Sequence, residues 1–196
     1  MESGCRKQAL PATVVLFGIK HSGKTSIGRL LSRELGWEFS DLDDCIEQKI
    51  RIEAGVSIRD FFRSGDHYRF FCIEKECLAT FLQGRPSPWI LATGGGIIDN
   101  RAALRLFPAE VMKIYLYNAP EVLYERIANK GLPPFLSPDN PYGSFLEIYE
   151  SRNSRYRKLA DITVDRTGLT REQSAGKIIT LLKEYRDARK QFWPLV

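Results

Sequence analysis

A glycine-rich loop directly behind an apolar stretch constrains this chain more than any other feature of its sequence. Residues 13–17 are β-branched and apolar, and residues 18–25, GIKHSGKT, fit the phosphate-binding pattern G-x-x-x-x-G-K-[ST]. From Ser26 onward, apolar residues recur at helical spacing until Gly36. The sequence therefore predicts a strand, a phosphate-binding loop and a helix in direct succession, with a chance glycine turn as the alternative.

The residues of this phosphate loop (18–25) have a definite chemistry. Successive backbone N–H groups in such a loop form a concave anion site, and the positive N-terminal end of the next helix adds to it. We expect Lys24 to reach the β- and γ-phosphates of ATP, and the Thr25 hydroxyl to bind Mg²⁺. The nucleotide-binding residues predicted from this stretch are Gly18, His21, Ser22, Gly23, Lys24, Thr25 and Ser26.

Charge and length limit the classes of function that remain. At 196 residues the chain suits one α/β domain, 1–196. Lys and Arg exceed Asp and Glu by 29 to 24, and the net charge of +5 favours an anionic ligand but is too diffuse to predict nucleic-acid binding. Residues 1–11 lack the apolar core of a signal peptide, and no apolar run approaches a membrane span. We expect a cytoplasmic monomer with no membrane partner.

Strand and helix patterns alternate along the chain. Beyond the first strand, short apolar stretches predict further strands at residues 37–40, 89–92, 111–117 and 161–164, with helical stretches between them. This alternation predicts an α/β fold of three layers, in which a five-stranded parallel sheet has helices on both faces. Ligands of such sheets bind at the carboxyl ends of the strands.

One long segment rich in proline and glycine interrupts the predicted helices. Residues 131–143, GLPPFLSPDNPYG, fit either a mobile lid or a plain surface loop. We take the lid to span about 129–143 and the acceptor-binding region to span about 43–85. As a lid, the segment is expected to become protected from hydrogen exchange when nucleotide and acceptor are both bound.

Two further motifs follow predicted strands. Asp41 and Asp43 stand two residues apart behind the second strand, so in an extended segment both carboxylates project to the same side. They could hold Mg²⁺ and orient an acceptor hydroxyl, whereas a helix cap at Asp43 or Asp44 is the alternative. Behind the third strand, residues 94–96 are a glycine triplet that lets a ligand approach the backbone, with a tight turn as the alternative.

In this order and in a chain of this size, the three motifs resemble the shikimate kinase family over nearly the whole chain. The resemblance implies a P-loop kinase-like fold with a lid, and transfer of the γ-phosphoryl group of ATP to a hydroxyl of shikimate in aromatic amino-acid biosynthesis. It implies that Lys24 and Asp43 are catalytic, with Asp43 as the base, and that Thr25 and Asp41 support Mg²⁺. ATP and Mg²⁺ are the implied cofactors.

The same resemblance assigns further binding residues. The glycine triplet, Gly94, Gly95 and Gly96, is expected to line the acceptor pocket. Arg152, in the segment RNSRYRKLAD, is expected to bind the carboxylate of the acceptor. Arg126 is expected to lie beside the nucleotide, with a surface helix arginine as the alternative.

The sequence also departs from the family pattern in the acceptor-binding region. Alignment of residues 65–74 on Glu74 puts Phe71 where the family has its second carboxylate-binding arginine, and Arg69 is two positions away. Alignment on Gly65 instead leaves Arg69 one position away. Residues 50–54 resemble a short insertion in this region. The lid has Pro133 where the family has another arginine.

Because of these departures, the sequence does not decide which molecule is the acceptor. Arg69 or Lys130 could supply the missing positive charge, in which case shikimate remains the acceptor. The alternatives are the same chemistry on a different small hydroxylated metabolite, or a nucleotide-binding regulatory protein with little turnover. Retention of both Asp41 and Asp43 argues against the regulatory protein, because binding alone does not require the second carboxylate.

Overall fold

The computed structural model describes residues 13–83, 88–133 and 136–192. Its centre is a parallel sheet of five strands in the order β2-β3-β1-β4-β5. Each strand begins within one residue of its predicted start, so the predicted fold class is confirmed. The strands are β1 (Thr13–Phe17), β2 (Glu38–Asp41), β3 (Trp89–Ala92), β4 (Met112–Tyr117) and β5 (Ile162–Asp165).

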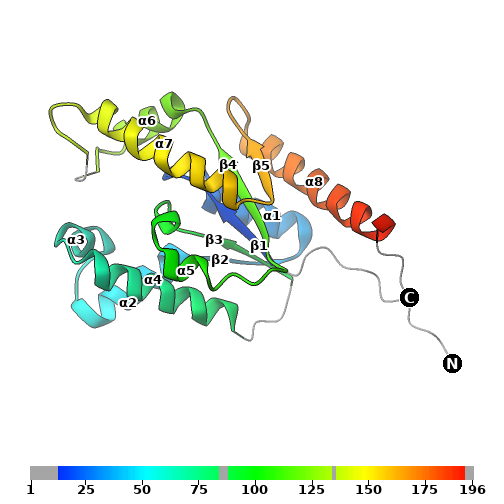
Figure 1. The fold of residues 1–196 in the computed structure, drawn as a ribbon, viewed down its shortest axis with the longest axis horizontal. Helices are drawn as coiled ribbons and strands as arrows, with labels where there is room; N and C mark the ends of the chain where they lie inside the picture. Colours follow the sequence, from blue (N-terminus) through cyan, green and yellow to red (C-terminus); the bar gives the residue numbers. More distant parts are fainter. Residues whose placement is uncertain (1–12, 84–87, 134–135, 193–196) are drawn as a thin grey trace.

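Helices cover both faces of the sheet, and Figure 1 shows the group α2, α3 and α4 at a distance from α8. None of the described helices is long and apolar enough to cross a membrane. The helices are α1 (Lys24–Leu35), α2 (Leu42–Ala54), α3 (Ile58–Arg63), α4 (His67–Leu82), the 3-10 turn η1 (Ile97–Asp99), α5 (Arg101–Leu104), α6 (Pro120–Ala128), α7 (Pro141–Leu159) and α8 (Arg171–Phe192).

The central strand β1 explains the layered arrangement. Successive side chains of a strand point to opposite faces, and four residues of β1 are fully buried. Val14 and Leu16 pack in a core with residues of α1 and α8. Val15 and Phe17 pack in a second core with residues of α2, α4, α6 and α7. A strand that is apolar on both faces therefore fixes the sheet between two helical layers.

The predicted lid joins α6 to α7. Its described residues form no helix or strand before α7 begins at Pro141, while Pro133 and Leu136 are buried. These two residues line a cavity of about 20 Å³ together with Ile19 and Arg152. Residues 134–135 of the lid and 84–85 of the acceptor-binding region lie outside the described residues. Closure of this segment on ligand binding stays a prediction.

Candidate active site

The three motifs meet at one edge of the sheet. The strands that precede them are neighbours, since β1 and β2 both pair with β3. Ala92, at the end of β3, is in register with both Leu16 and Asp41, and the Thr93 amide donates to the Leu16 carbonyl at 3.2 Å. Parallel strands thus deliver the phosphate loop, the aspartates and the glycine triplet to the same place.

The phosphate loop has the backbone of an anion site. His21 has φ +64° and Gly23 has φ +92°, and a Cβ at Gly18 would lie 2.3 Å from the Ser22 hydroxyl oxygen. That hydroxyl is buried without a hydrogen-bond partner among the described residues. Buried polar groups are nearly always paired, so an orphaned hydroxyl in a glycine-rich loop fits a phosphate oxygen.

Lys24 supplies a buried positive charge at this loop. Its side chain is almost fully buried, and Nζ donates to the carbonyls of Gly18 at 2.7 Å and Ile19 at 3.2 Å. Burial lowers the pKa of Lys24 to about 8, against the opposing attraction of Asp43 and Asp41. A desolvated ammonium beside two carbonyls is a strong binding partner for phosphate oxygens.

Thr25 and Asp41 form a pair of oxygen ligands next to Lys24. The Thr25 hydroxyl donates to Asp41 Oδ2 at 2.6 Å. Mg²⁺ prefers oxygen ligands and is usually held by one or two protein groups together with substrate phosphates. The described residues contain no group of three or more His, Cys, Asp and Glu that could hold a metal ion. Thr25 and Asp41 therefore fit the ion at the nucleotide phosphates.

The local structure around Asp43 corrects the expectation of an extended segment. β2 ends at Asp41, whose side chain caps α2 by accepting from the Asp43 amide at 3.1 Å. The alternative of a cap at Asp43 or Asp44 is also wrong, because the helix already begins at Leu42. Asp43 lies in the first turn of α2, where the helix N-terminus favours a negative charge.

Asp43 nevertheless faces the glycine triplet. A Cβ at Gly94 would lie 2.8 Å from Asp43 Oδ1, so a side chain there would displace this carboxylate. Asp43 is exposed as a residue, while its carboxylate lies against Gly94 and near the charges of Lys24 and Asp41. The resulting desolvation raises the pKa of Asp43, and Asp41 raises it further, while Lys24 opposes both. Such a carboxylate is a better proton acceptor than an ordinary aspartate.

Gly95 has no room for a side chain, and Gly96 lies in contact distance of Arg152. A Cβ at Gly95 would lie 2.7 Å from the Lys20 amide nitrogen, and one at Gly96 would lie 3.4 Å from Arg152 Nη2. The triplet thereby joins the phosphate loop on one side to α7 on the other. This close approach is more than a tight turn requires.

Arg152 is held by a carboxylate that the sequence analysis missed. Its Nε and Nη2 donate to Asp99 Oδ2 at 2.9 and 2.7 Å, and Nη1 lies 3.4 Å from the Gly95 carbonyl. Arg155 Nη2 bonds the other oxygen of Asp99. The spacing of Arg152 and Arg155 on one helical face could have indicated a second arginine, but no local pattern points to Asp99.

Glu74 is a second missed residue of the acceptor region. Its side chain is buried on α4, accepts from Asn100 Nδ2 at 2.9 Å, and has Oε1 3.4 Å from the position of a Cβ on Gly94. Burial raises its pKa to about 7, Asn100 opposes the shift, and Asp43 adds to it. The sequence signal that could have identified Glu74 is its position among apolar residues of a helix, because glutamate is rarely buried.

We expect Glu74→Gln to change how stability depends on pH. The unfolded chain releases this proton near the ordinary pKa of 4.5, whereas the folded chain keeps it up to about 7. As the pH rises from 4.5 to about 7, the free energy of unfolding of the wild type should fall by about 3 kcal/mol more than that of the variant. Urea unfolding of both proteins at several pH values measures the difference. If the free energies of unfolding of the two proteins change in parallel with pH, the pKa of Glu74 is not raised.

Arg126 lies beside the phosphate loop. It is half-buried on α6, and its Nη1 is 3.2 Å from the His21 carbonyl and 3.5 Å from Asn118 Oδ1. A plain surface position does not require contacts of this kind. The placement therefore favours a role at the nucleotide over the alternative of a surface helix arginine.

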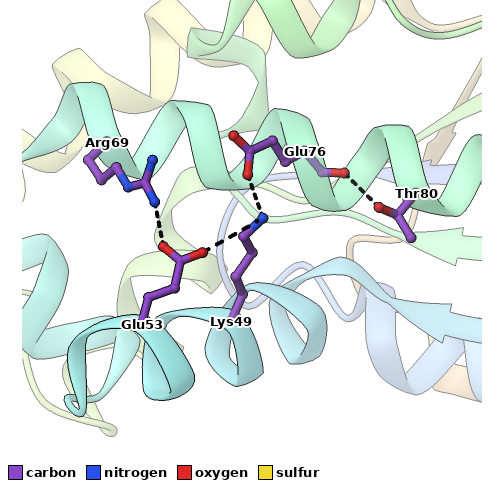
Figure 2. A network of polar contacts seen from close by, with 5 residues as sticks. All are labelled: Lys49, Glu53, Arg69, Glu76 and Thr80. Carbon is purple, nitrogen blue, oxygen red and sulfur yellow. Dashed lines mark hydrogen bonds and ion pairs between the residues drawn. The ribbon is translucent and has the colours of Figure 1, made fainter.

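Arg69, which the sequence suggests as a substitute for a family arginine, is engaged elsewhere. Figure 2 shows Arg69 on α4 pointing to Glu53 on α2, with 2.5 Å between Nη2 and Oε2. Lys49 joins the same network by pairing with Glu76 and with Glu53 at 3.8 Å. The network ties α2 to α4 on an exposed surface. Arg69 is thus engaged in the support of these helices.

The second proposed substitute, Lys130, is exposed at the end of α6. Its charge helps to lower the pKa of His21 to about 4, although burial of His21 is the larger cause. Lys130 therefore acts on the nucleotide side of the site. Arg155, through Asp99, is the second cation that the structure places next to Arg152.

Comparisons with known proteins agree with this architecture. Residues 20–183 match the family model for shikimate kinase. The chain is 32% identical over 172 residues to shikimate kinase of Thermodesulfovibrio yellowstonii, covering 88% of this chain and 94% of that protein. It is 37% identical over 152 residues to shikimate kinase of Thiobacillus denitrificans, covering 76% of this chain and 79% of that protein.

A solved structure of the same family is similar to this chain. The chain is similar to a shikimate kinase from Acinetobacter baumannii in complex with shikimate, with a TM-score of 0.77, 29% identity, and coverage of 89% of this chain and 94% of that one. The family model spans most of the sequence, including the phosphate loop from Lys20, the aspartates and the glycine triplet. The chain therefore belongs to the shikimate kinase family, whose members are phosphotransferases with an alcohol acceptor.

Proposed function

We propose that this protein transfers the γ-phosphoryl group of ATP to a hydroxyl of shikimate. One observation carries the proposal: the glycine triplet lies against Asp43 at Gly94, against the phosphate loop at Gly95 and against Arg152 at Gly96. The carboxylate base, the phosphate-binding loop and the acceptor-binding cation therefore surround the same short segment. Family membership supports ATP as the donor.

Each residue then has a defined task. ATP supplies the phosphoryl group, and bound Mg²⁺ offsets part of its charge. Lys24 stabilises the charge on the transferred group, and Thr25 with Asp41 would hold the metal. Asp43 accepts the proton of the acceptor hydroxyl, and its raised pKa suits that task. Arg152 orients the acceptor through its carboxylate.

The lid completes the site by excluding water. Pro133 and Leu136 are buried next to Ile19 of the phosphate loop, in the wall of the small cavity that Arg152 also lines. Apolar groups in this position keep solvent from the transferred phosphoryl group. A monomeric state and a cytoplasmic location remain predictions from the sequence.

A second candidate is the same transfer to an uncharged polyol, and the Arg152 contacts favour it. Asp99 already occupies Nε and Nη2 of Arg152, and Phe71 and Pro133 stand where the family has two further arginines. An acceptor carboxylate must therefore share Arg152 with an internal carboxylate. Arg155 offsets the charge of Asp99, which is why we retain shikimate as the first candidate.

The acceptor charge is tested by comparing kcat/KM for shikimate and for its uncharged methyl ester. We expect wild type to prefer the acid. Arg152→Met should remove that preference by lowering kcat/KM for the acid roughly 10- to 100-fold, the effect of losing a charge-assisted hydrogen bond. Arg157→Met, an exposed arginine on the same helix, is the matched control. Equal kcat/KM values for acid and ester in wild type would favour the polyol.

A further inference from the structure

Arg166 is a buried charge that none of the sequence motifs includes. It is 4% exposed and is the only arginine classed as buried among the described side chains. No carboxylate of the described residues lies within ion-pair distance of it. Burying an ionised group costs several kcal/mol unless it is paired. The position therefore needs an anion that the chain itself does not provide.

The contacts of Arg166 place it directly behind the phosphate loop. Nη1 donates to the Ser22 carbonyl, and Nε lies 3.5 Å from the Ser174 hydroxyl on α8. A Cβ at Gly23 would lie 2.3 Å from Nη1 and 3.1 Å from Cζ. The guanidinium thus fills the space that a side chain at Gly23 would occupy.

The electrostatics around Arg166 are unfavourable in the free protein. Burial lowers its pKa, and the positive charges of Arg126 and Arg171 lower it further. Arg126 meanwhile donates to the carbonyl of His21, the residue before Ser22. Arg126 on α6 and Arg166 directly after β5 therefore hold consecutive carbonyls of the phosphate loop. An anion bound at the phosphate loop would stabilise their combined charge.

We infer that Arg166 is a positioning residue of the nucleotide site, and this inference rests on the proposed use of ATP. By holding the Ser22 carbonyl and packing on Gly23, it keeps the loop N–H groups directed at the phosphates. Its charge adds to the attraction for the phosphate chain. A buried residue with only a packing role would not need a guanidinium, because a neutral side chain of similar size avoids the desolvation cost.

Nucleotide binding measured by calorimetry tests this assignment without an acceptor. We expect Arg166→Gln to weaken binding of ADP in the presence of Mg²⁺ roughly 10- to 100-fold, and to leave binding of adenosine unchanged because adenosine has no phosphate. Arg166→Lys keeps the charge but cannot contact Ser22 and Ser174 together, so its ADP affinity should be intermediate. Arg105→Gln, which changes an exposed arginine at the end of α5, is the control and should bind ADP like wild type.

Each outcome bears on a separate claim. ADP affinity equal to that of wild type in a folded Arg166→Gln protein would overturn the inference, and so would equal weakening of ADP and adenosine. If the glutamine variant does not fold, unchanged ADP affinity in Arg166→Lys overturns it instead. Failure of wild type itself to bind ADP would contradict the proposed function. In turnover, the Arg166 variants should raise KM for ATP far more than they lower kcat.

Discussion

Replacement of Lys24 by alanine is expected to abolish measurable phosphoryl transfer and to weaken ATP binding. Lys24 is the buried cation of the phosphate loop, and its ammonium is already desolvated in the free protein. Charge that develops on the transferred group would then lack its principal protein partner. Loss of one such preorganised donor lowers turnover by about 100- to 1000-fold, and the weaker ATP binding adds to this in kcat/KM.

The comparison for Lys24→Ala is Lys183→Ala, which removes an exposed lysine of α8 and should leave activity unchanged. Steady-state rates at several ATP concentrations separate kcat from KM for each variant. Thermal unfolding shows whether the alanine variant keeps its fold. A folded Lys24→Ala enzyme with the activity of wild type would remove the phosphate loop from the mechanism.

The second large effect is expected for Asp43→Asn, which should keep ATP binding and lower turnover about 100-fold or more. Asparagine preserves the size of the side chain next to Gly94 but cannot accept a proton, and removal of a general base has an effect of this scale. Asp44→Asn changes the next carboxylate along α2, which is exposed, and serves as the control. If the Asp43 variant keeps the turnover of wild type, Asp43 is not the base and only places a negative charge at the N-terminus of α2.

The pH dependence of kcat/KM distinguishes the role of Asp43 from that of Lys24. Asp43 acts in its ionised form, so activity should rise with pH through its raised pKa, and this rise should vanish in Asp43→Asn. Lys24 acts in its protonated form, so activity should fall as the pH of the assay increases past about 8. If kcat/KM of the wild type does not fall at acidic pH, Asp43 is not the base.

The sheet could be predicted from the sequence because its strands are short, apolar and separated by helical patterns. The phosphate loop could be predicted for a related reason, since Lys24 and Thr25 act within a few residues of one another. The local sequence did not predict the conformation at Asp43. The alternate spacing of Asp41 and Asp43 does not reveal that Asp41 caps a helix that begins at Leu42.

The rest of the site depends on contacts between distant parts of the chain. Asp99 meets Arg152 across 53 residues, and Arg166 meets Ser22 across 144. No periodicity or motif records such pairings, because they follow from how parallel strands bring separate loops to one edge of the sheet. The same reason explains why Arg69, close in sequence to the missing arginine, is engaged with Glu53 on the outer surface.

The most direct measurement follows the labelled γ-phosphorus of ATP in the presence of Mg²⁺ and shikimate. We expect the label to appear in a phosphate ester of shikimate, in step with ADP release, and neither product to be formed by Lys24→Ala. ADP release that does not depend on shikimate, with the label recovered only as inorganic phosphate, would contradict it.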